Sequence, residues 1–122
     1  MKPRSAKAKG RNLQNYVRDK LRQIFVEEWK LCPGLEEDDI KSQTMGMPGE
    51  DIMLSPSAKK LIPYSFECKN TERLNIWQAI EQASGNCEDR DPVVVVKRNR
   101  SKIYAVIEFD NFLTLIRRNY ER

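Results

Sequence analysis

The sequence predicts a single α/β domain in which a mixed β-sheet is flanked by helices. Apolar residues recur at helical spacing near the start of the chain, and later segments alternate as strands do. Four consecutive valines at 93–96 are typical of a strand that is covered on both faces. At 122 residues, the chain is most simply one domain with one modest core.

The first 30 residues divide into a basic arm and a helix. Residues 1–10 carry four cations and no acid, which predicts a disordered arm before a domain at 11–122. Residues 11–29 are predicted to be helical, because apolar side chains recur every three or four positions until Pro33 and Gly34 end the pattern. The apolar positions are Leu13, Val17, Leu21, Ile24 and Phe25.

Three strands are expected in the middle of the chain. In the third strand, Glu67 and Lys69 alternate with Phe66 and Cys68, so the two pairs point to opposite faces of the sheet. The strands are expected at about 40–45, 51–54 and 62–70, with turns at 47–49 and 55–57 and an acidic loop or strand lead-in at 36–39.

A helix, two strands and a terminal helix follow. Asn75 is expected to cap the next helix, and Gly85 is expected to end it. After the valine strand, a basic turn at 97–102 leads to a last strand at 103–109, and Asp110 is expected to cap the final helix. The predicted order is therefore α-β-β-β-α-β-β-α.

The net charge of +4 conceals a strong segregation. Residues 1–30 hold nine Lys/Arg against three acids, residues 31–58 hold one against six, and residues 92–122 hold seven against three. Basic flanks around an acidic middle suit a phosphodiester substrate, because cations hold the backbone while carboxylates hold a divalent metal. A solvated face or a tail is the alternative reading of such charge runs.

Residue types exclude several classes of chemistry. The chain has no histidine, which excludes Ser-His and Cys-His catalysis and histidine-ligated metals. Its three cysteines form no C-x-x-C pair, so we expect reduced thiols in or near the core. No apolar run is long enough to span a bilayer, and no signal-like stretch follows the basic start. We therefore expect a cytoplasmic protein with no membrane partner.

Asp51, Glu67 and Lys69 form the most informative group. Residues i and i+2 of a strand share a face, so Glu67 and Lys69 stand side by side near the turn that carries Asp51. Two carboxylates supply the hard oxygen ligands that Mg²⁺ or Mn²⁺ prefers, and a lysine can stabilise charge developing on phosphorus. The group is a candidate metal-dependent nuclease site. The alternative is an exposed ion pair with Asp51 serving only its turn.

This pattern resembles the PD-(D/E)xK nuclease superfamily, and within it the small Holliday-junction resolvase-like and phage-encoded endonucleases. The resemblance rests on the run 48–51, the hairpin interval, the triplet 67–69 and the following helix with Gln78 and Gln82. It covers nearly the whole chain and implies a restriction-endonuclease-like core. One departure is that a proline stands three residues before Asp51 instead of immediately before it.

The resemblance also implies roles for further residues. The Cys68 backbone carbonyl is expected to complete the metal site, and Gln82 to support Lys69, with Gln78 as a less specific candidate. Relatives carry a glutamate where this chain has Gln14, which brings no charge, so we expect one well-held metal ion. Glu50 is a possible additional ligand. An ordinary polar helix face is the alternative for both glutamines on the second helix.

DNA contacts are expected from both basic flanks. Lysine and arginine contact phosphates without reading sequence, so selectivity should depend on DNA structure. Tyr64 and Trp77 are expected in the core, with stacking on an unpaired base as the alternative. The expected phosphate contacts are Lys7, Lys9, Arg11, Arg18, Lys97, Arg98, Arg100 and Lys102.

Taken together, the sequence predicts a Mg²⁺-dependent endodeoxyribonuclease that acts on duplex or branched DNA in recombination, repair or processing, in a bacterial or phage-infected cell. One chain offers one site, so cutting both strands favours a homodimer. Three alternatives stay open: an inactive nucleic-acid-binding module of the same fold, an RNA-directed nuclease, and a structural or partner-binding protein.

Overall fold

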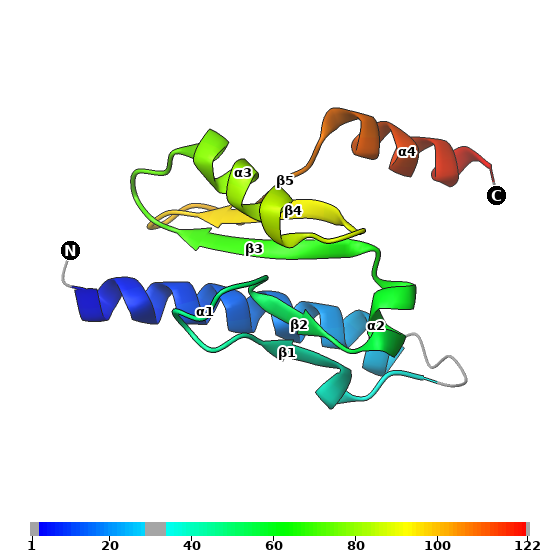
Figure 1. Cartoon of the computed structure of the whole chain (residues 1–122), viewed down its shortest axis with the longest axis horizontal. Coiled ribbons are helices and arrows are strands. Elements are labelled where there is room, and N and C mark those ends of the chain that lie inside the picture. The colour runs from blue at the N-terminus through cyan, green and yellow to red at the C-terminus, as the bar shows by residue number, and fades with distance from the viewer. Residues whose placement is uncertain (1–2, 29–33, 122) are drawn as a thin grey trace.

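A three-stranded mixed sheet lies between helices in the computed structural model, which describes residues 3–28 and 34–121 (Figure 1). The helix α1 covers one face of this sheet, and α3 covers the other. The mixed α/β fold predicted from the sequence is confirmed. Strands β3 (Tyr64–Asn70) and β4 (Asp91–Lys97) are parallel, β5 (Tyr104–Val106) is antiparallel to β4, and the covering helices are α1 (Pro3–Arg22) and α3 (Ile76–Asn86).

A separate hairpin lies beside α1 and carries the aspartate of the candidate site. Its strands β1 (Ile40–Ser42) and β2 (Ile52–Leu54) pair antiparallel, with Ile40 opposite Leu54. One backbone hydrogen bond, from Asp51 N–H to the Phe66 carbonyl at 3.0 Å, joins the hairpin to β3. That contact places Asp51 at the free edge of β3.

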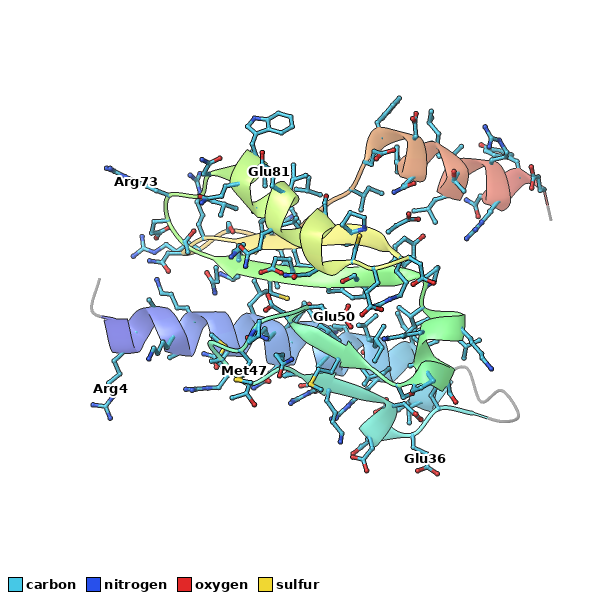
Figure 2. All side chains as sticks on the ribbon, viewed as in Figure 1. Arg4, Glu36, Met47, Glu50, Arg73 and Glu81 are labelled. Carbon is cyan, nitrogen blue, oxygen red and sulfur yellow. The ribbon has the colours of Figure 1, made fainter. Side chains whose placement is uncertain are left out.

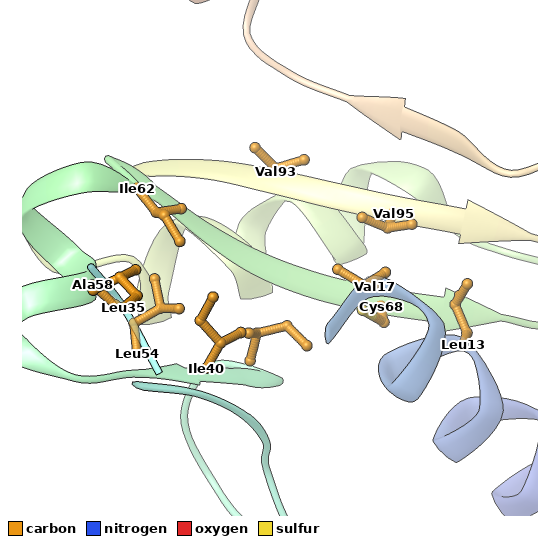
Figure 3. Close-up of a cluster of buried hydrophobic side chains, with 11 residues drawn as sticks. Leu13, Val17, Leu35, Ile40, Leu54, Ala58, Ile62, Cys68, Val93 and Val95 are labelled. Atoms are coloured by element: carbon orange, nitrogen blue, oxygen red, sulfur yellow. The ribbon is translucent and has the colours of Figure 1, made fainter. Parts of the chain in front are cut away.

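The main core fills the space between α1, the hairpin and one face of the sheet (Figure 3). Alternation along β3 and β4 directs Cys68, Val93 and Val95 into this core, while Val94 faces Ala79 and Ala83 of α3. Because β4 is buried on both faces, its valine run matches the sequence prediction. The triplet Glu67 to Lys69 is therefore anchored by its middle residue.

The chain begins differently from the sequence prediction. Helix α1 starts at Pro3, so residues 3–10 are helical where a disordered arm was expected. The segment is rich in Ala, Lys and Arg, which favour helix, and Pro3 occupies a first-turn position that tolerates proline. Tertiary contacts also hold it, because Asn70 donates to the Lys9 carbonyl at 3.2 Å and the Lys9 amine bonds Asn99. The helix continues as a π-helical segment, Gln23–Glu28, and residues 29–33 lie outside the described part of the chain.

The segment at 55–57 was predicted as a turn, and this was wrong. Ser55 caps a short helix, α2 (Pro56–Leu61), by accepting a hydrogen bond from the Ala58 N–H. A serine followed by proline is a helix start when the next residues can pack, and Ala58 is fully buried. The acidic segment, predicted as a loop or strand lead-in, contains a short 3-10 helix, Glu37–Asp39, that leads directly into β1.

The end of the chain departs from the sequence prediction in two respects, and Trp77 of α3 departs from it as well. Strand β5 is shorter than expected, and the last helix, α4 (Phe109–Tyr120), begins after Glu108, so Asp110 lies in its first turn and does not cap it. Trp77 is 74% exposed, so its predicted place in the core was wrong, whereas Tyr64 packs against the core. By contrast, Asn75 caps α3 as predicted, by accepting from the Gln78 N–H. Among the described residues, no helix is both long and apolar enough to cross a membrane.

Candidate active site

A cavity of about 300 Å³ opens where the edge of β3 meets α1, α3 and the hairpin loop. Three sequence-predicted residues line it together, Asp51, Glu67 and Lys69, which come from two separate elements. Gln14 and Gln82 also line it, whereas Gln78 does not. The complete lining is Gly10, Gln14, Thr44, Met45, Gly46, Met47, Asp51, Glu67, Cys68, Lys69 and Gln82.

Asp51 is fixed by the backbone of β3. Its Oδ2 accepts a hydrogen bond from the Cys68 N–H at 2.6 Å, while its own N–H donates to Phe66. Burial raises the pKa of Asp51, and this effect outweighs the lowering by the Cys68 N–H and the nearby Lys69 charge. One carboxylate oxygen, Oδ2, is thus held in place by the backbone of β3.

Glu67 is the most deeply buried acid of the cavity, with 3% of its surface exposed. Burial and the adjacent Asp51 charge raise the pKa of Glu67 to about 7, although Lys69 opposes them. The Asp51 and Glu67 carboxyl groups are also close enough for a hydrogen bond that changes both pKa values. Two carboxylates can only accept hydrogen bonds, so a proton on one of them, or a bound cation, would relieve their repulsion.

Lys69 and Gln82 complete the wall of the cavity. The Lys69 Nζ donates to Gln82 Oε1 at 2.8 Å and lies 3.5 Å from Glu67 Oε1. These two contacts hold the ammonium at the carboxylate pair and leave donor capacity for a further oxygen. Gln82 therefore occupies the supporting position expected for it. The backbone N–H of Gln78 serves the α3 cap.

Hydrogen bonds to two backbone carbonyls define which way the side-chain amide of Gln14 points. Its Nε2 donates to the Asp51 carbonyl at 2.9 Å and approaches the Gln43 carbonyl at 3.5 Å. Because a carbonyl oxygen can only accept, the amide nitrogen must face both partners, and Oε1 points elsewhere. Gln14 thus ties α1 to the backbone of the residue that supplies the first carboxylate. Gly10, one turn earlier, leaves room for Met45, whose Cε lies 3.0 Å from where a Cβ would stand.

A buried ion pair beside the site was missed by the sequence reasoning. Arg90 lies 2.6 Å from Glu50 Oε2, which also accepts from the Ser65 hydroxyl at 2.7 Å. Arg90 in addition donates to the Tyr64 carbonyl at 3.2 Å. Figure 2 places Glu50 between the hairpin and β3. These contacts are all made by Oε2 of Glu50, and Glu50 is not among the residues that line the cavity.

The hairpin loop also supplies cavity residues that the sequence reasoning treated only as a turn. Residues 44–47 line the site, and Gly46 adopts a φ of 83°, which favours glycine. Met47 of this loop, labelled in Figure 2, is one of these lining residues. The sequence signal for these cavity residues was the turn immediately before Asp51, because a turn next to a site residue lies close to the site.

The predicted DNA contacts form two groups that meet beside the cavity. The start of α1 and the turn at 97–102 are joined through Lys9 and Asn99, and both line a neighbouring hollow of about 320 Å³ with Lys97. Gly10 and Gln14 of the same helix face the site cavity. Arg18, further along α1, is paired with Asp19 at 2.9 Å. Exposed cations of the two groups are Lys7, Arg11, Arg98, Arg100 and Lys102.

The donor set fits a small hard cation better than any other metal. Glu67 Oε2 is buried and has no hydrogen-bond partner among the described residues. In that part of the chain no group of three or more His, Cys, Asp or Glu side chains can surround a metal ion, so two carboxylates must be joined by backbone or substrate oxygens. The Cys68 thiol faces the core, and burial raises its pKa, which leaves the backbone carbonyl as the hard oxygen donor that this residue could offer.

Comparison with known proteins identifies the family. Residues 5–121 match the family described as phage putative PDDEXK endonuclease. The chain belongs to this family. No curated protein and no solved structure matches the chain.

Membership in the PD-(D/E)xK family confirms the resemblance read from the sequence and supports nuclease activity in general. The match covers α1 through α4, so it includes every element that lines the cavity. Nucleases of this superfamily generally use divalent metals, in agreement with the donor set of the cavity. A nuclease family also implies DNA as substrate.

Proposed function

We propose that this PD-(D/E)xK protein is a Mg²⁺-dependent endodeoxyribonuclease that hydrolyses phosphodiester bonds. The observation that carries the proposal is the buried Glu67 carboxylate, which meets Asp51 and lies 3.5 Å from Lys69 in an open cavity. A carboxylate pair held out of water is costly unless a proton or a cation offsets its charge, and a divalent metal ion can take the place of the proton. A merely structural ion pair would not require two acids against one lysine.

Asp51, Glu67 and the Cys68 carbonyl would hold the metal, with Mn²⁺ able to replace Mg²⁺. The ion supplies Lewis-acid activation of the scissile phosphate and of the attacking water. Gln14 contributes no charge, so the site supports one well-held ion. Its amide instead fixes the Asp51 backbone at 2.9 Å.

Lys69 has the geometry of a transition-state stabiliser. Gln82 and Glu67 fix its ammonium, so little rotamer entropy is lost when a phosphate oxygen approaches. Its remaining donor capacity is directed at the cavity that Asp51 and Glu67 line. The side chain can therefore orient water or neutralise the charge that develops on phosphorus.

The basic groups on α1 and at 97–102 would hold the DNA backbone. Their lysines and arginines bind phosphates irrespective of sequence, which favours a structure-selective or weakly sequence-selective enzyme. We place this activity in phage or cellular DNA recombination, repair or processing, in the cytoplasm of a bacterial or infected host cell. Cutting both strands of a duplex or a branched junction is best served by a homodimer.

A nucleic-acid-binding module with weak or no cleavage is the second candidate. It is favoured by one observation, the neutral Gln14 at the place of a third acid. Such a module binds DNA in EDTA and yields no cut product in Mg²⁺. RNA cleavage by the same site is distinguished only by comparing substrates.

The test incubates purified protein with supercoiled, linear, single-stranded and four-way branched DNA, and with single-stranded RNA, in Mg²⁺, Mn²⁺ or EDTA. We expect cleavage in either metal, none in EDTA, and none from Asp51→Asn or Lys69→Ala. Lys41→Ala, which removes an exposed lysine of β1 outside the cavity, is the matched control and should cut normally. Cleavage that persists in EDTA, or that survives in both site variants, refutes the mechanism.

A further inference from the structure

The helix α4 has an apolar face that the described part of the chain leaves unburied. No residue of α4 is buried, and Figure 1 shows the helix projecting from the body of the protein. Apolar residues at spacings of three and four form one stripe along it. A 12-residue helix is marginal in water by itself, so this stripe calls for a partner surface. The stripe consists of Phe109, Phe112, Leu113, Ile116 and Tyr120.

An open apolar groove lies at the base of the same helix. It encloses about 370 Å³ between α3 and the edge formed by β4 and β5, and it is separate from the site cavity. Trp77 stands at its rim with 74% of its surface exposed. An exposed tryptophan beside an apolar hollow is the residue type that most often anchors protein interfaces. The groove is also lined by Ile80, Pro92, Val94, Val106 and Ile107.

Only the first residue of the stripe, Phe109, lines the groove of its own chain, and the other stripe residues do not. Ile107 and Glu108 separate the end of β5 from the start of α4, and both line the groove together with Phe109. Beyond Phe109 the helix runs outward from the body of the protein (Figure 1), which carries the rest of the stripe away from this groove. A second copy, placed by a twofold axis, can offer its groove to this helix and receive a helix in return.

The exposed area is sufficient for such an exchange. At about 200 Å² for a complete aromatic side chain, the exposed fractions of Trp77 and the three α4 aromatics amount to on the order of 550 Å² per chain. The aliphatic stripe residues and the groove walls bring this close to the roughly 800 Å² that each partner buries in a standard specific interface.

We propose that α4 docks in the Trp77 groove of a second copy, and that this reciprocal contact makes a symmetric homodimer. The interface gives the dimer of the proposed nuclease a defined surface. It rests on α3, β5 and α4 and on none of the cavity residues. It can therefore be tested in EDTA and without DNA, so its failure and the failure of the nuclease proposal are separate results.

Sedimentation velocity across about 1 to 100 µM protein measures the association. We expect a wild-type dimer, and at least a 100-fold or so weaker association for Ile116→Glu, because each dimer loses the contact twice. Leu115→Glu is the matched control: it is 38% exposed against 39% for Ile116, but lies about 100° around the helix, off the stripe. Since neither side chain is buried in the chain itself, both variants should fold as the wild type does.

A mixing experiment tests the groove. Trp77→Glu alone and Ile116→Glu alone should each be monomeric, whereas their mixture should associate through the one intact helix and the one intact groove. A wild-type chain that stays monomeric at about 100 µM overturns the proposal, whether the helix folds back onto its own groove or binds another protein. A dimer that tolerates Ile116→Glu as well as it tolerates Leu115→Glu overturns it too.

Discussion

Replacing Glu67 by glutamine should stabilise the metal-free protein at alkaline pH. Glutamine has the shape of a protonated glutamate, and its amide can donate to the Asp51 carboxylate where the wild type needs a proton. The variant therefore keeps the contact but removes the cost of a buried charge. The ion pair with Lys69 at 3.5 Å is lost, which reduces the gain.

The sign and size follow from linkage between protonation and folding. The pKa of Glu67 is about 7 in the folded chain, against 4.5 for the unperturbed group, so the folded state binds the proton more tightly. The tighter proton binding by Glu67 therefore contributes stability that is fully present below pH 4.5, falls as pH rises, and is lost above about pH 7. The rise from 4.5 to about 7 corresponds to about 3 kcal/mol, the most that the substitution can recover at pH 8.

The assay is urea unfolding in EDTA at pH 5 and at pH 8. We expect the free energy of unfolding of Glu67→Gln to exceed that of the wild type by about 1 to 3 kcal/mol at pH 8 and to differ little at pH 5. Glu81→Gln is the control, since Glu81 is an exposed acid on the outer face of α3 (Figure 2). Added Mg²⁺ should stabilise the wild type and the control more than Glu67→Gln.

Two results would refute this reasoning. Equal effects of Glu67→Gln at both pH values would mean that Glu67 is not held protonated in the folded chain. Equal stabilisation of wild type and Glu67→Gln by Mg²⁺ would mean that this carboxylate does not hold the metal.

Three further predictions concern the neighbours of the carboxylate pair and the DNA surface. Gln14→Glu should raise Mg²⁺ affinity in calorimetry but lower the stability of the metal-free chain, because a carboxylate cannot donate to the Asp51 carbonyl; unchanged values for both would contradict the assigned orientation. Arg90→Ala should cost about 3 kcal/mol in urea unfolding and weaken Mg²⁺ binding, since it leaves Glu50 buried without its charge partner; the Glu50→Gln/Arg90→Met double variant should recover most of the stability. Lys102→Ala should lower the salt dependence of DNA binding by about one unit of slope without changing preference among sequences, and an unchanged slope would place that lysine off the DNA.

The sequence was informative about the site where local geometry determined the outcome. Alternation along a strand placed Glu67 and Lys69 on the same face of the sheet. Four-residue spacing placed Gln78 and Gln82 on the same face of a helix. The structure separates those glutamines, because only Gln82 reaches the cavity. Helical phase alone cannot make this distinction, since it depends on how far α3 extends along the sheet.

Contacts between distant segments were beyond the sequence reasoning. The Glu50–Arg90 pair joins residues 40 positions apart, and nothing in either local pattern marks them as partners. The helical start of α1 was missed for a related reason, since a run of cations reads as disordered until a surface is available to hold it. Trp77 was assigned to the core on its residue type, which does not reveal that α3 presents it beside a groove.

The burial of Glu67 and the neutrality of Gln14 are best understood together. A third carboxylate beside Asp51 and Glu67 would add repulsion that the metal-free chain must sustain, in a cavity where burial already raises the pKa of both acids. An amide at that position donates to the Asp51 carbonyl and adds no charge, so the pair can remain in place with a single bridging proton. Gln14 therefore has two effects. It limits the charge available for a second metal, and it keeps the two-acid site folded before any metal binds. The Gln14→Glu variant separates these two effects in one protein.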